Sequence, residues 1–397
     1  MKKKFNLIIL ISLILGVLGG LYIPNFMNNV SFLGTIYINL LKFMIIPVIF
    51  TSIMVTIYET QKKKATIFLN TILTFLIMFV VSFLLTTLVV YIIKPWVGFT
   101  FENVTWPGKI ISFSLPEIIT NLFPTNIVTI ISNNAILPCL LVATFSGIAA
   151  SKVELGDKVI IVIKGIKNIS NKLLEYIIYI TPLGVFALIG NTVANYGTSI
   201  IGTSFKYIGT AYLCSIIIIL LVMVLPVWII AKINPLEYIK NVSRIWLMTL
   251  TTCSSAATLP YTIKTCNEKF NIPSKITNIV VPLGCTIHMC GGAVSFALLG
   301  IFTAQLYGIE ITLITYLLML VSATLINMAA AGIPSQGIVL GATYLSLFGI
   351  PLSFIGIYSG FYRLLDMAYT TLNVTGDVTA NILINHIDYN KKEKTSV

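Results

Sequence analysis

The stretch Asp366-Met-Ala-Tyr-Thr370-Thr-Leu-Asn373-Val-Thr-Gly376-Asp377 decides the fold, because it places two carboxylates inside a long apolar segment. Spacings of four, three and four residues put Asp366, Thr370, Asn373 and Asp377 on one face of an α-helix. Intramembrane carboxylates are costly without a partner, which can be a cation, an ammonium group, a proton or an arginine. The alternative interpretation is a structural hydrogen-bond network of protonated acids.

Composition supports a membrane location for this helix. The chain has 397 residues, of which 57% are hydrophobic and only 10% are charged, whereas about a quarter of a soluble domain is charged. This excludes a cytosolic enzyme and a disordered chain, and argues against nucleic-acid binding despite a net charge of +12. The apolar runs are continuous rather than alternating, so we expect an all-α polytopic membrane protein.

The basic residues indicate the topology. With a cytoplasmic N-terminus, most Lys and Arg fall in cytoplasmic loops, as the positive-inside rule requires. Residues 1–24 resemble a secretory signal, but the apolar run is long and its cleavage site is poor, so we expect a retained first helix. We therefore expect a multi-pass protein of the cell (plasma or inner) membrane with both termini in the cytoplasm.

Three polar interruptions in the C-terminal half point to a protein-lined cavity, because irregular backbone is not tolerated against lipid. Thr252–Pro260 and Ala329–Gly337 read as small-residue tips between apolar arms, and free N–H groups at such a tip can bind a carboxylate. Ordinary helix packing and a plain loop are the respective alternatives.

The third interruption, Pro282–Gly292, is rich in glycine. Unwound carbonyls together with the Thr286 hydroxyl are hard oxygen ligands that suit an alkali cation. His288 and Cys290 are spaced like a transition-metal pair, but the further ligands of such a site are missing from the sequence. We therefore expect an alkali cation here rather than a transition metal.

At these places, and over nearly its whole length, the chain resembles the dicarboxylate/amino acid:cation symporters, which include glutamate and neutral-amino-acid transporters. The matching motifs are Leu41–Pro47, Ser254–Pro260, Ala331–Pro334 and the quoted Asp366–Asp377 stretch. The resemblance implies eight transmembrane helices plus two re-entrant helical hairpins, a homotrimer, and an elevator-type movement for alternating access.

The resemblance also implies a division of the chain. Residues 1–150 would hold scaffold and trimerisation helices 1–4, with helix 3 shared with the transport domain. Residues 151–235 would hold helices 5 and 6, the fifth in the scaffold and the sixth in the transport domain. Residues 236–397 would form the transport core, with hairpin 1, helix 7, hairpin 2 and helix 8.

The family pattern assigns roles to individual residues. Asp366 would bind the substrate ammonium, while hydroxyls, amides and hairpin tips would bind the α-carboxylate. The expected substrate-binding residues are Ser254, Ser255, Ile333, Gly337, Asp366, Tyr369, Thr370 and Asn373. Two sodium sites would use side chains and backbone carbonyls, and the expected residues are Gly284, Thr286, His288, Met289, Asn373 and Asp377.

Departures from the family pattern bear on specificity. Tyr369 and Cys253 stand at the two positions where members with acidic substrates can carry an arginine, so a second substrate carboxylate would lack its bidentate partner. We therefore expect a neutral amino acid coupled to sodium. The alternative is an acidic amino acid or dicarboxylate coupled to sodium or protons, for which Arg363, three residues before Asp366, is the candidate partner.

A third family cation site is expected to be lost. Its acidic ligand is Cys290 here, and the matching hydroxyl positions of the third helix are Phe75, Met78 and Phe79 in an ungapped register. A neutral thiol cannot compensate a buried sodium ion as a carboxylate does. His288 is a candidate for coupling protons instead.

Functions of other classes have weaker support. A channel or a non-transporting sensor would predict a continuous polar pore and non-saturating flux. A membrane enzyme would need a nucleophile, metal or nucleotide motif, and the sequence offers none. The expected partners are a small-molecule amino acid and the lipid bilayer, with no nucleic acid and no enzymatic activity.

Overall fold

A computed structural model describes residues 2–62, 66–97, 120, 123–132, 136–196, 199–328 and 335–395. Every regular element in this part of the chain is helical, which confirms the expected all-α class. The first half contains α1 (Lys2–Tyr22), α2 (Pro24–Asn29), α3 (Ser31–Lys62), α4 (Thr66–Ile93), α6 (Ile127–Ser132), α7 (Ile136–Ala150) and α8 (Gly156–Tyr196).

The second half is divided into shorter helices. α9 (Ser199–Ile218) continues through a π-helical turn, Ile219–Val224, into α10 (Leu225–Ala231). The elements that follow are α11 (Pro235–Thr252), α12 (Ser255–Lys269), α13 (Ser274–Ile287), α14 (Cys290–Leu306), α15 (Leu313–Asn327), α16 (Gln336–Leu347) and α17 (Ser353–Thr395).

Helix length and apolar composition support a multi-pass membrane protein. Within the described residues, three helical stretches are long and apolar enough to cross a bilayer: Leu69–Ile93, Ser204–Ala231 and Ser274–Leu306. Two bent pairs raise this number to five if each pair is one span; one pair is bent by 119° between α1 and α2, the other by 48° within α8.

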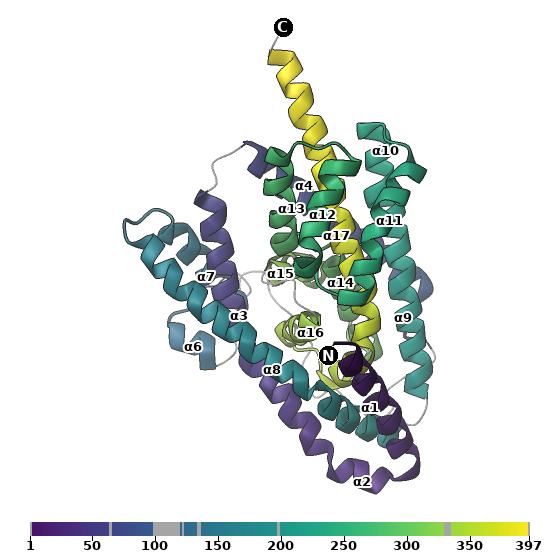
Figure 1. Cartoon of the computed structure of the whole chain (residues 1–397). Helices are drawn as coiled ribbons and strands as arrows, with labels where there is room; N and C mark the ends of the chain where they lie inside the picture. The colour runs from purple at the N-terminus through teal and green to yellow at the C-terminus, as the bar shows by residue number, and fades with distance from the viewer. Residues whose placement is uncertain are drawn as a thin grey trace.

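The helices gather in two groups. α1, α2, α3 and α8 pack along one another, and α7 packs on α3; they occupy the lower and left part of Figure 1. α4, α9 to α13, α15 and α16 surround α14 and α17, whereas α6 packs on α7. α14 is almost wholly buried, whereas α4 and α8 expose Leu88, Ile161 and Ile169, as helices that face lipid do.

Two of the expected interruptions, Thr252–Pro260 and Pro282–Gly292, contain breaks between helices. α11 ends at Thr252, Cys253 has a left-handed backbone with φ 47°, and the Ser254 side chain caps α12 by accepting the Ala257 N–H. α11 and α12 pack against each other, as the two arms of a hairpin do. α13 and α14 are separated by His288 and Met289, both in non-helical conformations.

The remaining interruption, Ala329–Gly337, falls between α15 and the start of α16. α15 ends at Asn327 and α16 begins at Gln336 after Ser335, whose φ of 63° is left-handed. Residues 329–334, among them the expected substrate ligand Ile333, lie outside the described residues.

Candidate functional site

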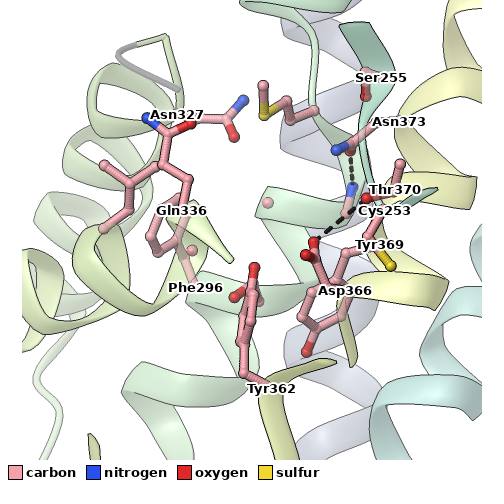
Figure 2. A pocket seen from close by; sticks show the side chains of 16 residues that line it. Cys253, Ser255, Phe296, Asn327, Gln336, Tyr362, Asp366, Tyr369, Thr370 and Asn373 are labelled. Atoms are coloured by element: carbon pink, nitrogen blue, oxygen red, sulfur yellow. Dashed lines mark hydrogen bonds between the residues drawn. The ribbon is translucent and has the colours of Figure 1, made fainter. Parts of the chain in front are cut away.

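A pocket opens where α17, α14, α16 and the break between α11 and α12 meet. Asp366, Thr370 and Asn373 line one side of it, and Asn327 and Gln336 lie on the other (Figure 2). The full set of described lining residues is Cys253, Ser255, Met289, Gly291, Gly292, Ser295, Phe296, Asn327, Gln336, Gly337, Leu340, Tyr362, Asp366, Tyr369, Thr370 and Asn373.

Most of the substrate residues expected from the sequence converge on this pocket. Six of them line it: Ser255, Gly337, Asp366, Tyr369, Thr370 and Asn373. Ser254 lies next to the pocket as the buried N-cap of α12. Met289, expected near a cation, lines the pocket as well.

Several lining residues were not anticipated, among them two amides and two aromatic residues. Asn327 and Gln336 flank the break between α15 and α16, and Phe296 and Tyr362 come from α14 and α17. The sequence feature that could have indicated Asn327 is its polar amide at the end of an apolar run. Gln336 belongs to the stretch Ala329–Gly337, which the sequence identifies as a hairpin tip without assigning Gln336 a role. Tyr362 is one turn before Asp366 on the same helix, but tyrosine in an apolar helix carries no local signal of function.

Asp366 is held at the pocket by two donors. Its Oδ2 accepts the Ser335 N–H at 2.9 Å, and its Oδ1 accepts the Thr370 hydroxyl at 3.3 Å. The residue is only 7% exposed. No lysine or arginine occurs among the described residues that line the pocket, so the carboxylate is the charged group that a bound molecule meets there.

Asn373 ties α17 to the start of α14. Its Oδ1 accepts the Gly291 N–H at 2.8 Å. The two helices approach closely at this point, because a Cβ on Gly291 would lie 2.5 Å from the Tyr369 Cα and 2.6 Å from its carbonyl carbon. Glycine at 291 is therefore required by the backbone of the facing helix.

Replacing Gly291 by Ala is expected to lower the thermal stability of the protein, because the new methyl group meets backbone that cannot rotate away. Overpacking of this kind costs about 1–3 kcal/mol. The matched control is Gly165→Ala in α8, where a Cβ meets nothing within 4 Å and helix propensity favours alanine. Thermal unfolding in detergent measures both; equal melting temperatures for the two variants would contradict the close approach.

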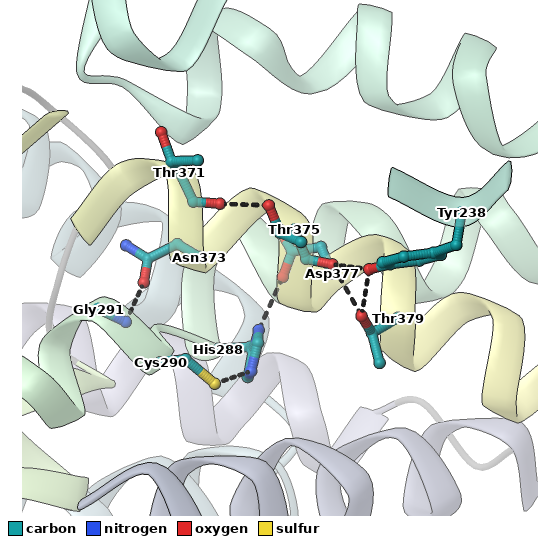
Figure 3. Close-up of polar contacts among 9 residues, drawn as sticks. All are labelled: Tyr238, His288, Cys290, Gly291, Thr371, Asn373, Thr375, Asp377 and Thr379. Atoms are coloured by element: carbon teal, nitrogen blue, oxygen red, sulfur yellow. Dashed lines mark hydrogen bonds and ion pairs between the residues drawn. The ribbon is translucent and has the colours of Figure 1, made fainter. Parts of the chain in front are cut away.

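Asp377 lies further along the same face, beside the break between α13 and α14. Its Oδ1 is 2.9 Å from Nδ1 of His288, and Nε2 of that ring is 3.0 Å from Sγ of Cys290 (Figure 3). A Cβ on Gly284 would lie 2.6 Å from the carboxylate carbon of Asp377. The lack of a side chain at 284 thus lets the carboxylate reach the backbone of α13.

This neighbourhood can accommodate a small cation on chemical grounds. Asp377 supplies a carboxylate, and the helix break at His288 and Met289 interrupts the regular backbone hydrogen bonding of α13. Carboxylate and carbonyl oxygens are the ligands that hard cations take. Of the other residues expected at cations, Gly284 and Thr286 lie in the last turns of α13.

A ladder of polar contacts fixes α11 to α17 beside this site. The Tyr238 hydroxyl lies 2.7 Å from the Thr379 hydroxyl, Trp246 Nε1 donates to Thr375 Oγ1 at 3.0 Å, and Thr249 and Thr371 share a hydrogen bond of 2.7 Å. Figure 3 shows the Tyr238 end of this ladder. Buried hydroxyl pairs of this kind specify the register between two helices.

The sequence model of a protein family described as the sodium:dicarboxylate symporter family matches residues 5–387. The chain belongs to this family. The symporter is 27% identical to the proton/glutamate-aspartate symporter of Bacillus subtilis, over 97% of this chain and 95% of that protein. It is 28% identical to the proton/sodium-glutamate symport protein of Bacillus caldotenax, over 95% and 93%.

A third relative is named for a different class of substrate. The symporter is 28% identical to the C4-dicarboxylate transport protein of Burkholderia lata, over 98% of this chain and 95% of that protein. All three relatives are matched over nearly their whole length, so the pocket and the helix break lie inside the region of similarity. The family is one of transporters, which agrees with the expectation that the chain is not an enzyme.

The two departures noted in the sequence both lie in the symporter's pocket. Cys253 and Tyr369 line it, and the Tyr369 ring packs near that of Tyr362, with 6.4 Å between centroids. Arg363 is partly exposed on α17 and is not among the described lining residues. The pocket wall next to Asp366 is therefore aromatic and neutral.

Proposed function

We propose that the symporter takes up an amino acid by secondary active transport, with a cation as the coupled ion. The observation that carries this proposal is the Asp366 carboxylate, buried at a pocket whose described lining holds no basic side chain. A buried carboxylate needs a cationic partner, and a substrate ammonium supplies one. A dicarboxylate without an amine would instead place its own negative charge against Asp366.

Two kinds of side chain remain as candidates for the substrate. The names of the relatives mention glutamate, aspartate or C4-dicarboxylates. These names favour the acidic alternative over the neutral amino acid expected from the sequence. The neutral substrate is supported by the lining at Cys253 and Tyr369, which offers a second carboxylate no bidentate partner. For an acidic substrate, Arg363 is the candidate partner, one turn from Asp366 on α17.

A ligand panel separates these candidates. We expect the purified protein to be stabilised by its amino-acid substrate, because a ligand that binds the folded state shifts unfolding by RT ln(1 + [L]/Kd). The panel contains glutamate, aspartate, succinate, serine, alanine and tyrosine, each in sodium chloride and in choline chloride. Stabilisation by glutamate or aspartate selects the acidic candidate, and stabilisation by serine, alanine or tyrosine selects the neutral one. Stabilisation by succinate alone would contradict the role given to Asp366.

For the coupled ion, we propose two sodium sites. The first would use the Asp377 carboxylate with carbonyls of Gly284, His288 and Asn373, and the second would involve Thr286 and Met289. The relative from Bacillus caldotenax is named for both protons and sodium, so proton coupling is the second candidate.

The third family cation site is proposed to be lost. Cys290 contacts the His288 ring, and the Phe75 ring stacks on the same imidazole at 4.6 Å. The neighbourhood therefore holds a thiol and an aromatic ring where oxygen ligands would be needed.

The remaining architecture is proposed from the resemblance. Eight spans and two hairpins, a homotrimer and an elevator movement would divide the chain at residues 1–150, 151–235 and 236–397. The grouping of α1, α2, α3 and α8 apart from the helices around α14 and α17 is compatible with a scaffold and a transport unit. We place the protein in the cell membrane with both termini cytoplasmic.

A further inference from the structure

His288 occupies the break between α13 and α14 with a fully buried side chain. Both ring nitrogens have a partner: Nδ1 is 2.9 Å from Asp377 Oδ1, and Nε2 is 3.0 Å from Cys290 Sγ. An ionised Asp377 carboxylate can only accept a hydrogen bond, so with Asp377 in that form the ring proton lies on Nδ1. Nε2 is then the acceptor for the Cys290 thiol proton, and the neutral imidazole is satisfied at both ends.

The ring is also packed on one face and at its Cε1 edge. Phe75 from α4 stacks on it with centroids 4.6 Å apart and planes at 19°. Gly376 from α17 leaves the room that the ring fills, because a Cβ there would lie 3.2 Å from Nε2 and 3.3 Å from Nδ1. Residues from three helices, α4, α14 and α17, therefore hold the imidazole in one orientation, with its donor aimed at Asp377.

Asp377 depends on this donor. The Asp377 side chain is 2% exposed, and among the described residues its carboxylate contacts the neutral His288 imidazole. A buried carboxylate left without a donor is strongly destabilising in protein interiors. After releasing its substrate and cation, a symporter must change back to its starting conformation while empty. In that state the buried Asp377 carboxylate would destabilise the protein unless another residue donates a hydrogen bond to it.

We propose that His288 is a positioning residue that substitutes for the coupled cation at Asp377 while the carrier is empty. The Nδ1–H of the fixed ring satisfies the carboxylate, which keeps α17 docked on the break between α13 and α14 in the cation-free protein. The inference rests on the proposed function in one respect, namely that a cation binds at Asp377. The ring acts on the return of the empty carrier rather than on substrate binding.

Two substitutions at residue 288 separate the effect of losing the hydrogen-bond donor from the effect of losing the ring's shape. His288→Asn keeps an amide donor near the position of Nδ1, whereas His288→Leu fills the space and has no donor. In sodium-free choline buffer we expect H288L to melt several degrees below H288N. Adding Asp377→Asn to each variant should remove that difference, because a neutral amide no longer needs the donor. This double-mutant cycle measures the coupling between residues 288 and 377 without any sodium present.

Transport in proteoliposomes gives the functional readout. Net uptake requires the empty carrier to return, whereas exchange of labelled for unlabelled substrate at saturating cation does not. We expect H288L to lose net uptake by about tenfold to a hundredfold, as an unsatisfied buried acceptor would imply, and to lose much less of its exchange activity. H288N should lose less net uptake than H288L, because its amide can still donate to Asp377.

Three results would overturn the proposal: no coupling in the double-mutant cycle, equal behaviour of H288L and H288N, or a parallel loss of exchange and net uptake in H288L. Failure of the proposed function looks different. A wild-type protein that is stabilised by no amino acid and transports none would refute the transport assignment, whereas the cycle between residues 288 and 377 would still report whether the imidazole holds the carboxylate.

Discussion

Replacing Asp366 by Asn is expected to weaken substrate binding and uptake strongly while leaving the fold intact. The substitution keeps the size of the side chain, and its amide oxygen can still accept the Ser335 N–H that Asp366 accepts at 2.9 Å. It removes the negative charge that faces a pocket with no basic residue among its described lining residues. Loss of one partner of a buried charged pair costs about 2–5 kcal/mol, so affinity for an amino acid should fall by about 30-fold or more.

The measurement is substrate-induced stabilisation together with uptake in proteoliposomes. Glu237→Gln is the matched control, since it removes one carboxylate from an exposed position in the first turn of α11 and should change neither readout. Unaltered affinity in D366N would show that the ammonium binds elsewhere, and the proposed function would lose its main support.

Replacing Asp377 by Asn is expected to separate cation binding from substrate binding. Asp377 is buried beside the helix break, and its charge is the main attraction that this site offers to sodium. Removing a buried charge from a cation site costs about 3 kcal/mol or more, so the sodium concentration for half-maximal stabilisation should rise by about 100-fold. A sodium titration of thermal stability at fixed substrate measures this directly.

Substrate titrations at the highest usable sodium concentration provide the internal control for D377N. Affinity for the amino acid should recover there towards the wild-type value, because Asp366, Thr370 and Asn373 are unchanged and lie at the pocket. An unshifted sodium dependence in D377N would remove Asp377 from the coupling site and leave it a structural role beside His288.

The helical face at the C-terminal end was predictable because it depends on spacing alone. The period of an α-helix places residues four, three and four apart on one side wherever the helix packs, and α17 confirms it. The structure shows in addition that this helical face borders two neighbouring sites, the pocket and the break between α13 and α14. Asp366, Thr370 and Asn373 line the pocket, whereas Asp377 contacts His288 at the helix break.

The helix breaks were predictable for a related reason. Small and polar residues in an apolar run weaken the helix locally, and the structure has breaks at Cys253–Ser254 and at His288–Met289. The class of substrate was harder to predict from the sequence. Cys253 and Tyr369 suggested a neutral substrate, the relatives favour an acidic one, and residue type at two positions cannot decide where a partner such as Arg363 points.

By itself, the sequence determined the membrane-embedded helical class, the shared face of Asp366 and Asp377, and the places where helices break, because each of these depends on composition or on residues close together in the chain. Tertiary structure alone decided which distant residues meet. Phe75 stacks on His288, Ser335 donates to Asp366, and Asn327 faces the pocket only because α4, α16 and α15 pack where they do. Such contacts arise from packing between helices far apart in the chain, and no local period encodes them.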